Sequence, residues 1–284
     1  MRDLSRDFGA CAINTATLGF QAPISAVIDA VARAGFGGIA PWRREIEGQD
    51  VSAVARQIRE AGLTVPGYCR STYIPAADRS DFRQNIESNR RAISTAAELG
   101  SQSFVMVVGS LPQGSKDIAA ARAQVREACA LLLEHGRASG VRIALEPLHP
   151  VYAADRSCLS LLSEALDHCD AIEGDVPEPW LGTCIDVYHV WWDPNLARDI
   201  MRAGAGRRIF GFHVCDWLVP TEHPLNDRGM MGDGVIDIPA IRAMIEGAGY
   251  AGLVEAEIFS AENWWKRPMP EILATCRDRF ASAV

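Results

Sequence analysis

Short apolar runs alternate with longer segments of helical periodicity along the whole chain. Segment 23–33, for example, places Ile24, Val27 and Val31 on one helical face. The run Phe104-Val-Met-Val-Val108 is instead apolar throughout, which is typical of a strand in a parallel sheet covered on both faces. The pattern predicts eight strands, at 9–14, 37–41, 63–68, 103–108, 141–145, 181–186, 209–213 and 252–258. It predicts eight helices, at 23–33, 51–60, 82–99, 118–138, 160–169, 194–203, 238–248 and 270–280.

Glycines mark the junctions between the predicted helices and the strands that follow them. Five of them follow a helical pattern and precede an apolar run, as expected for the left-handed residue that ends a helix: Gly35, Gly62, Gly100, Gly140 and Gly249. Eight chained βα units predict a single (β/α)8 TIM barrel, an α/β fold, as one domain over 1–284. An open doubly wound sheet would place a glycine-rich phosphate turn after its first strand, and segment 14–19 does not supply one.

The connection 214–237 differs from the others. It is long and polar, contains several prolines and glycines, and has no helical period. Loops of this length in compact domains are usually functional. Because it follows the seventh strand, we expect it to fold over the face where the strands end.

Four consecutive predicted strands each end in a side chain that can bind a metal. These are Glu146, Asp186, His213 and Glu257. The carboxyl ends of all strands open on one face of a parallel barrel, so we expect the four side chains to converge. Three buried carboxylates need a compensating positive charge. The sequence therefore predicts a divalent metal site, with oxygen-rich ligation that favours Mn²⁺ first and Mg²⁺, Co²⁺ or Zn²⁺ as alternatives.

Several motifs at these strand ends resemble those of the xylose-isomerase-like sugar isomerase/epimerase superfamily. They are Leu145-Glu-Pro-Leu-His149, Asp186-x-x-His189, Phe212-His-Val-x-Asp216, Gly232-Asp-Gly-Val-Ile-Asp237 and Val254-Glu-Ala-Glu-Ile-Phe-Ser260. The resemblance covers essentially the whole barrel and is specific for the site rather than for the substrate.

The resemblance implies roles for individual residues. It makes Glu146, Asp186, His213 and Glu257 the metal ligands, and Glu146 and Glu257 the catalytic acid and base. Glu257 is chosen over Glu255 because it matches the superfamily's Glu-x-Phe position. The resemblance also implies that His189, Arg228 and Asp216 lie near the substrate.

The expected reaction moves a proton on a carbon beside a metal-bound carbonyl of a keto-sugar, through an enediolate, in an epimerase or aldose–ketose isomerase. A lyase of the same superfamily, acting on a keto-inositol or a 3-keto-glycoside, begins with the same step and stays an alternative. His149 is a candidate base for that chemistry, or else it stiffens its loop or bonds to Glu146. A carbon–glycoside-cleaving lyase would require a small β-rich partner subunit.

Two further residues follow predicted strands. Trp42 is a candidate to stack on a sugar, or else to close the mouth of the barrel. Arg70 is a candidate to bind a hydroxyl or a phosphate. No cluster of basic residues accompanies Arg70 in the sequence, so we expect an unphosphorylated keto-sugar or a related polyol.

Composition narrows the class of protein. The net charge of −8 and the absence of a basic stripe argue against nucleic acid, and six histidines are too few for the zinc cluster of an apurinic endonuclease. Eight scattered cysteines without a C-x-x-C pair indicate a reducing compartment. With no signal peptide and no apolar run of spanning length, we expect a cytoplasmic protein without membrane association. The superfamily leads us to expect a homo-oligomer, a dimer or tetramer.

Overall fold

The computed structural model of the protein describes residues 2–284, and its centre is one parallel sheet of eight strands. The strands are β1 (Cys11–Asn14), β2 (Gly38–Ala40), β3 (Tyr68–Cys69), β4 (Ser103–Met106), β5 (Arg142–Leu145), β6 (Leu181–Asp186), β7 (Ile209–Val214) and β10 (Val254–Ala256). They pair in the order β2-β1-β10-β7-β6-β5-β4-β3. Single parallel bridges, Gly38 with Thr64 and Trp42 with Cys69, link the two edges, so the sheet forms a nearly closed barrel.

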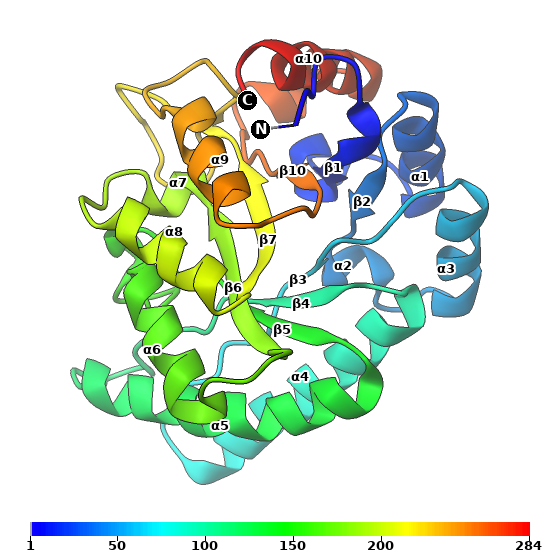
Figure 1. The fold of residues 1–284 in the computed structure, drawn as a ribbon. Helices are drawn as coiled ribbons and strands as arrows, with labels where there is room; N and C mark the ends of the chain where they lie inside the picture. Colours follow the sequence, from blue (N-terminus) through cyan, green and yellow to red (C-terminus); the bar gives the residue numbers. More distant parts are fainter. Residues whose placement is uncertain (1) are drawn as a thin grey trace.

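Helices surround the barrel and lie between successive strands (Figure 1). The long ones are α1 (Ile24–Arg33), α3 (Val51–Glu60), α4 (Arg79–Leu99), α5 (Ile118–Ser139), α6 (Leu162–Glu173), α8 (Leu196–Ala205), α9 (Ile238–Gly247) and α10 (Met269–Ser282). Two single turns follow strand ends, α2 (Arg43–Ile46) and α7 (Val187–Val190). The architecture is the predicted (β/α)8 TIM barrel.

Local sequence explains where these helices begin and end. Asp78 and Asp117 accept backbone N–H bonds at the start of α4 and α5, which satisfies amide groups that have no partner within the helix. Gly100 and Gly140 end the same two helices with a φ of 74°. Glycine adopts this left-handed conformation without the steric cost that a Cβ imposes, as the sequence pattern predicted.

The third strand departs most from its predicted bounds. Segment 63–68 makes isolated bridges at Thr64 and Val65, and the regular strand β3 begins only at Tyr68. Pro66 lies between them and has no N–H to contribute to a sheet. The other strands agree with their predicted positions within three residues at either end.

The core is continuous from the strands to the helices. The side chains of β4 are fully buried, and one large apolar cluster joins the barrel wall to the surrounding helices. This double coverage explains the apolar run at 103–108. None of the helices within residues 2–284 has the length and apolar character that crossing a lipid bilayer demands.

The connection 214–237 contains a short antiparallel hairpin of β8 (Asp216–Trp217) and β9 (Arg228–Gly229). The hairpin folds the loop back, so that Arg228 reaches the residues at the ends of β6 and β10. The loop therefore covers the face that the sequence assigned to it.

Candidate metal and substrate site

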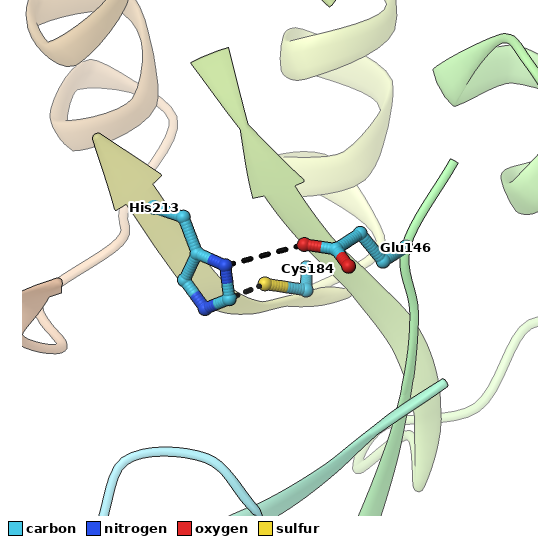
Figure 2. Close-up of side chains that lie close together, drawn as sticks. All are labelled: Glu146, Cys184 and His213. Carbon is cyan, nitrogen blue, oxygen red and sulfur yellow. Dashed lines mark hydrogen bonds and ion pairs between the residues drawn. The ribbon is translucent and has the colours of Figure 1, made fainter. Parts of the chain in front are cut away.

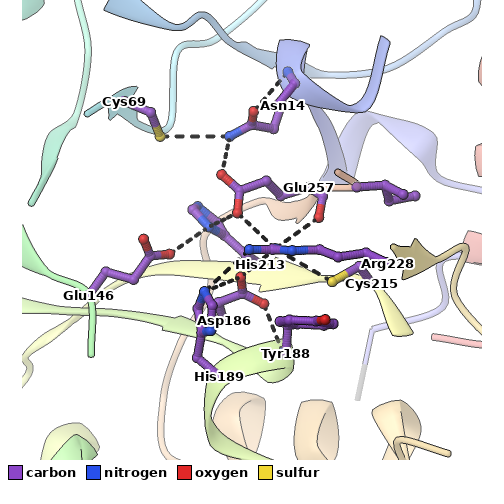
Figure 3. Close-up of polar contacts among 12 residues, drawn as sticks. Asn14, Cys69, Glu146, Asp186, Tyr188, His189, His213, Cys215, Arg228 and Glu257 are labelled. Atoms are coloured by element: carbon purple, nitrogen blue, oxygen red, sulfur yellow. Dashed lines mark hydrogen bonds and ion pairs between the residues drawn. The ribbon is translucent and has the colours of Figure 1, made fainter. Parts of the chain in front are cut away.

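Four acidic and imidazole side chains meet at the carboxyl ends of the strands. Glu146 follows β5, Asp186 ends β6, His213 lies near the end of β7 and Glu257 follows β10. All four are at least 95% buried, and one ligand atom from each lies within 4.8 Å of the others. Figure 3 shows them pointing toward one another from different strands. The structure thus brings together the four residues that the strand-end pattern singled out.

Two buried atoms of this cluster, Oε1 of Glu146 and Nδ1 of His213, form an ion pair with each other at 3.2 Å (Figure 2). Among residues 2–284 neither atom makes any other hydrogen bond. The Glu146 oxygen has a further lone pair without a donor, and a cation bound at the cluster would satisfy it.

The donor set fits a divalent cation. Two ligands bonded at about 2.1 Å each cannot be more than about 4.2 Å apart. The 4.8 Å spread therefore requires only small side-chain movements to surround one ion. Three carboxylates and one imidazole suit Mn²⁺, Mg²⁺, Co²⁺ or Zn²⁺, so these residues could hold the expected metal.

Electrostatics support the same conclusion. Burial raises the pKa of Glu146 to about 7, that of Asp186 to about 6 and that of Glu255 to about 7. Burial alone would also raise the pKa of Glu257, but His213 and Arg228 beside it hold that pKa below its usual range. Burial and mutual repulsion disfavour the ionised form of these carboxylates, and a further positive charge in the site would stabilise it.

A second layer of polar groups lies beneath the ligands. His213 uses its other ring nitrogen, Nε2, which lies 3.2 Å from Oε1 of Glu255 and 3.3 Å from the Sγ of Cys184. Asn14, at the end of β1, donates from Nδ2 to Oε1 of Glu255 at 2.7 Å and to Oε1 of Glu257 at 3.0 Å. Glu255 is therefore one layer deeper than Glu257 on the same strand, as expected from the alternation of side chains along β10.

Arg228 is the cation that the structure itself supplies. Its Nη1 lies 2.9 Å from Oδ2 of Asp186 and 3.1 Å from Oε2 of Glu257 (Figure 3). Its guanidinium stacks over the rings of Tyr188 and Phe259, at 4.4 and 4.8 Å from the ring centroids. These contacts fix a buried guanidinium at the edge of the carboxylate cluster.

His189 lies between this arginine and the cluster. Its Nε2 is 3.2 Å from Nη2 of Arg228 and 3.6 Å from Oδ2 of Asp186. Two donors approach the ring of His189, the backbone N–H of His149 at Nδ1 and the guanidinium of Arg228 at Nε2. Burial, followed by the charge of Arg228, holds the pKa of His189 well below its usual value, so the ring is neutral.

A cavity of about 150 Å³ opens above Glu146 and Glu257. Its other lining residues include four that the sequence singled out, Trp42, Arg70, His189 and Arg228. The remaining ones are Cys69, Tyr73, Val107, Leu148, Tyr152, Arg156, Leu225 and Phe259. The cavity is thus walled by aromatic and apolar side chains, with polar groups concentrated on its floor and rim, as in sites for small molecules.

Four predicted site residues lie outside the cavity lining: Asp186 and His213, which belong to the ligand cluster, and His149 and Asp216. The ring of His149 packs on Trp217, with centroids 4.8 Å apart, and its Nδ1 accepts the backbone N–H of Val151. The carboxylate of Asp216 accepts backbone N–H groups of Trp217, Gly232 and Ile236. In this structure both side chains stabilise loops beside the site.

The sequence model of the xylose isomerase-like TIM barrel family matches residues 28–276. The chain belongs to this family. The resemblance inferred from the strand-end motifs is therefore confirmed. No functionally curated protein matches the chain in sequence.

Several solved structures resemble this xylose isomerase-like barrel in fold. The crystal structure of protein SMc04130 from Sinorhizobium meliloti 1021 is 48% identical, with a TM-score of 0.93, and the match covers 97% of this chain and 98% of that one. The IolI protein with a bound zinc atom is 18% identical, with a TM-score of 0.78 and coverage of 96% and 98%. A D-allulose 3-epimerase from Methylomonas sp. is 18% identical, with a TM-score of 0.77 and coverage of 96% and 97%. The last two show likeness of fold.

Some residues of this family member's site were not identified from the sequence. Asn14 carried the relevant signal, because it is a polar residue at the tip of a predicted strand, like the four ligand candidates. Arg156 carried none, because it lies in the segment after β5, where no periodicity fixes the direction of a side chain.

Proposed function

We propose that the protein is a divalent-metal-dependent epimerase or isomerase of a keto-sugar. The observation that carries the proposal is the buried cluster of Glu146, Asp186, His213 and Glu257, whose ligand atoms lie within 4.8 Å of one another beneath a cavity of about 150 Å³. The likeness of fold to a D-allulose 3-epimerase supports a ketose as the class of substrate.

Glu146, Asp186, His213 and Glu257 would hold the metal, with Mn²⁺ as the first choice. When bound, a divalent cation polarises a carbonyl and neutralises the negative charge that develops on its oxygen. The zinc atom bound in the IolI structure supports a divalent metal in a barrel of this fold.

Glu146 and Glu257 would transfer the proton. Both carboxylates line the cavity, and they come from strands that β6 and β7 separate in the barrel wall. A substrate between them presents one face of its reacting carbon to each carboxylate, so that one removes the proton and the other returns it. This arrangement suits inversion beside a carbonyl as well as movement of the carbonyl by one carbon.

Arg228 and His189 would orient the substrate. The guanidinium and the neutral imidazole face the cavity from the side of Asp186. The guanidinium can donate to carbonyl or hydroxyl oxygens of a sugar, and the imidazole can form a hydrogen bond with a hydroxyl. Trp42, Tyr152 and Phe259 form an aromatic wall that excludes water from the reacting carbon.

The test is solvent exchange. Protein stripped of metal and reloaded with Mn²⁺ would be incubated in D₂O with ketohexoses, inososes and 3-keto-glucosides, and the products analysed by NMR and mass spectrometry. Deuterium beside the carbonyl of a new epimer or aldose is the expected result. Loss of water or an aglycone would assign the lyase reaction, and a product without deuterium would assign hydride transfer.

Variants assign the residues. Glu146→Gln and Glu257→Gln should each lower kcat by at least about a hundredfold, because general acid–base groups contribute about 10²–10⁴-fold. Glu60→Gln, an exposed glutamate on α3, is the matched control and should retain full activity. Full activity in either cavity variant would refute its acid–base role.

A further inference from the structure

Two arginines meet at the rim of the cavity from distant parts of the chain. Arg70 follows β3 and Arg156 lies in the segment after β5, yet both line the cavity that has Glu146 and Glu257 on its floor. Both side chains are partly exposed, whereas the two glutamates are buried. The rim therefore carries positive charge in addition to Arg228.

One tyrosine joins the two guanidinium groups. Arg70 stacks over the ring of Tyr73 at 4.6 Å from its centroid, and Nη1 of Arg156 lies 3.5 Å from the hydroxyl of the same tyrosine. Arg156 also lies over the ring of Tyr152, at 5.8 Å. These contacts hold both guanidinium groups beside the cavity. Because the two side chains are already ordered, binding a ligand costs less conformational entropy.

The two charges are poorly compensated by the protein. Arg70 has no carboxylate partner among residues 2–284, and its one hydrogen bond is to the backbone oxygen of Ser71 at 3.5 Å. Arg156 has a single acidic neighbour, Asp155, at 4.0 Å, and that carboxylate is 68% exposed. Both guanidinium groups line one cavity, so an anion bound there would gain charge-assisted hydrogen bonds that the protein itself does not supply.

We propose that Arg70 and Arg156 bind an anionic group, a carboxylate or a phosphate, on the substrate. The inference rests on the proposed function, because it places the reacting end of the sugar on the floor and the anionic end at the rim. A carboxylate agrees with the expectation of an unphosphorylated sugar, whereas a phosphate departs from it; that expectation rested on the lack of a basic cluster beside Arg70 in the sequence. The substrate class is then a keto-sugar acid or a keto-sugar phosphate.

The first experiment measures binding without turnover. Mn²⁺-loaded protein would be titrated by calorimetry with glucitol, gluconate and glucitol 6-phosphate, which share a six-carbon chain and lack the ketone or aldehyde that turnover requires. We expect at least one anionic probe to bind about tenfold or more tightly than glucitol, with the advantage decreasing at high salt. The preferred anion distinguishes a carboxylate from a phosphate.

Variants show whether the arginines are the cause. Arg70→Gln and Arg156→Gln should each reduce the ratio of anionic to neutral affinity at least about fivefold, while Arg70→Lys should retain part of it. Arg59→Gln removes an equal charge from the exposed surface of α3 and should leave the ratio unchanged. Equal affinities for all three probes, no binding by any, or an anion preference that survives both glutamine variants would each overturn the proposal.

The outcome is separable from that of the proposed function. A protein that prefers the anionic probes through these arginines but catalyses no solvent exchange would retain the anion site and lose the isomerase assignment. Solvent exchange on a neutral ketose with no preference among the probes would do the reverse.

Discussion

The Nε2 atom of His213 lies 3.2 Å from Oε1 of Glu255, one layer below the four candidate ligands. A ring proton on Nε2 can be donated to this carboxylate, which leaves the lone pair of Nδ1 directed at the space shared with Glu146. Carboxylates that fix the tautomer of a ligand histidine typically contribute about 10–100-fold to metal affinity. Glu255 is therefore a positioning residue in the proposed metal site.

Glu255→Gln should weaken Mn²⁺ binding about 10–100-fold, because a side-chain amide can donate to Nε2 and favour the wrong tautomer. Calorimetric titration of the metal-free protein measures the affinity directly. Cys184→Ala removes the other contact of Nε2 but leaves the carboxylate, so its loss should be smaller. An affinity unchanged in Glu255→Gln would show that the carboxylate does not set the tautomer.

The metal-free protein should lose stability as the pH rises from 6.5 to 8. Burial raises the pKa of Glu146 and that of Glu255 to about 7, whereas both are near 4.3 in the unfolded chain. The folded state therefore holds more protons in this window, and its stability falls as those protons leave, by about 1 kcal/mol for each group. His149 and His189, whose pKa values are lowered, favour the opposite trend mainly below pH 6.5.

Calorimetry of protein treated with EDTA should thus show a melting temperature a few degrees lower at pH 8 than at pH 6.5. Glu255→Gln should reduce this difference, because it removes one of the groups that titrate near pH 7. Added Mn²⁺ should raise the melting temperature most at pH 8, where the ligands are ionised. A metal-free protein that is more stable at pH 8 would contradict the account.

The strand-end rule explains why the floor of the site was predictable from sequence. Glu146, Asp186, His213 and Glu257 each follow a short apolar run, and a parallel barrel places all such ends on one face. Asn14 obeys the same rule, although only its strand was predicted.

The rim of the site was not predictable in this way. The ring of His149 turns onto Trp217, and Arg156 approaches Tyr73, through loop conformations that depend on contacts between distant segments. Periodicity fixes the side-chain direction in strands and helices but not in such loops. For the same reason, the sequence could not show that two arginines share one rim.

Asp216 should act through the loop that carries Arg228. Its buried carboxylate accepts the N–H groups of Gly232 and Ile236 at 2.9 and 3.0 Å, and that of Trp217 at 2.9 Å. Asp216→Asn keeps the shape but turns an acceptor into a donor that faces an N–H group, at a cost of about 1–3 kcal/mol.

We therefore expect faster hydrogen exchange at the amides of Gly232 and Ile236 in Asp216→Asn, together with a lower kcat/KM because Arg228 is less firmly held. Asp227→Asn is the comparison, since that carboxylate accepts one N–H, from Glu222, nearer the surface of the same loop. Equal rates of amide hydrogen exchange at Gly232 and Ile236 in the two variants would show that Asp216 does not organise the loop.

The amino-terminal end of the barrel offers a test of packing that is independent of the site. A Cβ added to Gly37, which precedes β2, would lie 1.8 Å from the backbone oxygen of Gly9. Backbone cannot yield as a flexible side chain can, so Gly37→Ala should lower the free energy of unfolding by more than about 3 kcal/mol or prevent folding. Gly247, at the end of α9, has no atom within 4 Å of the same added carbon. Gly247→Ala should therefore be neutral or stabilise by up to about 1 kcal/mol. Thermal melts compare the two, and similar melting temperatures would mean that the strand β2 does not approach Gly9 this closely.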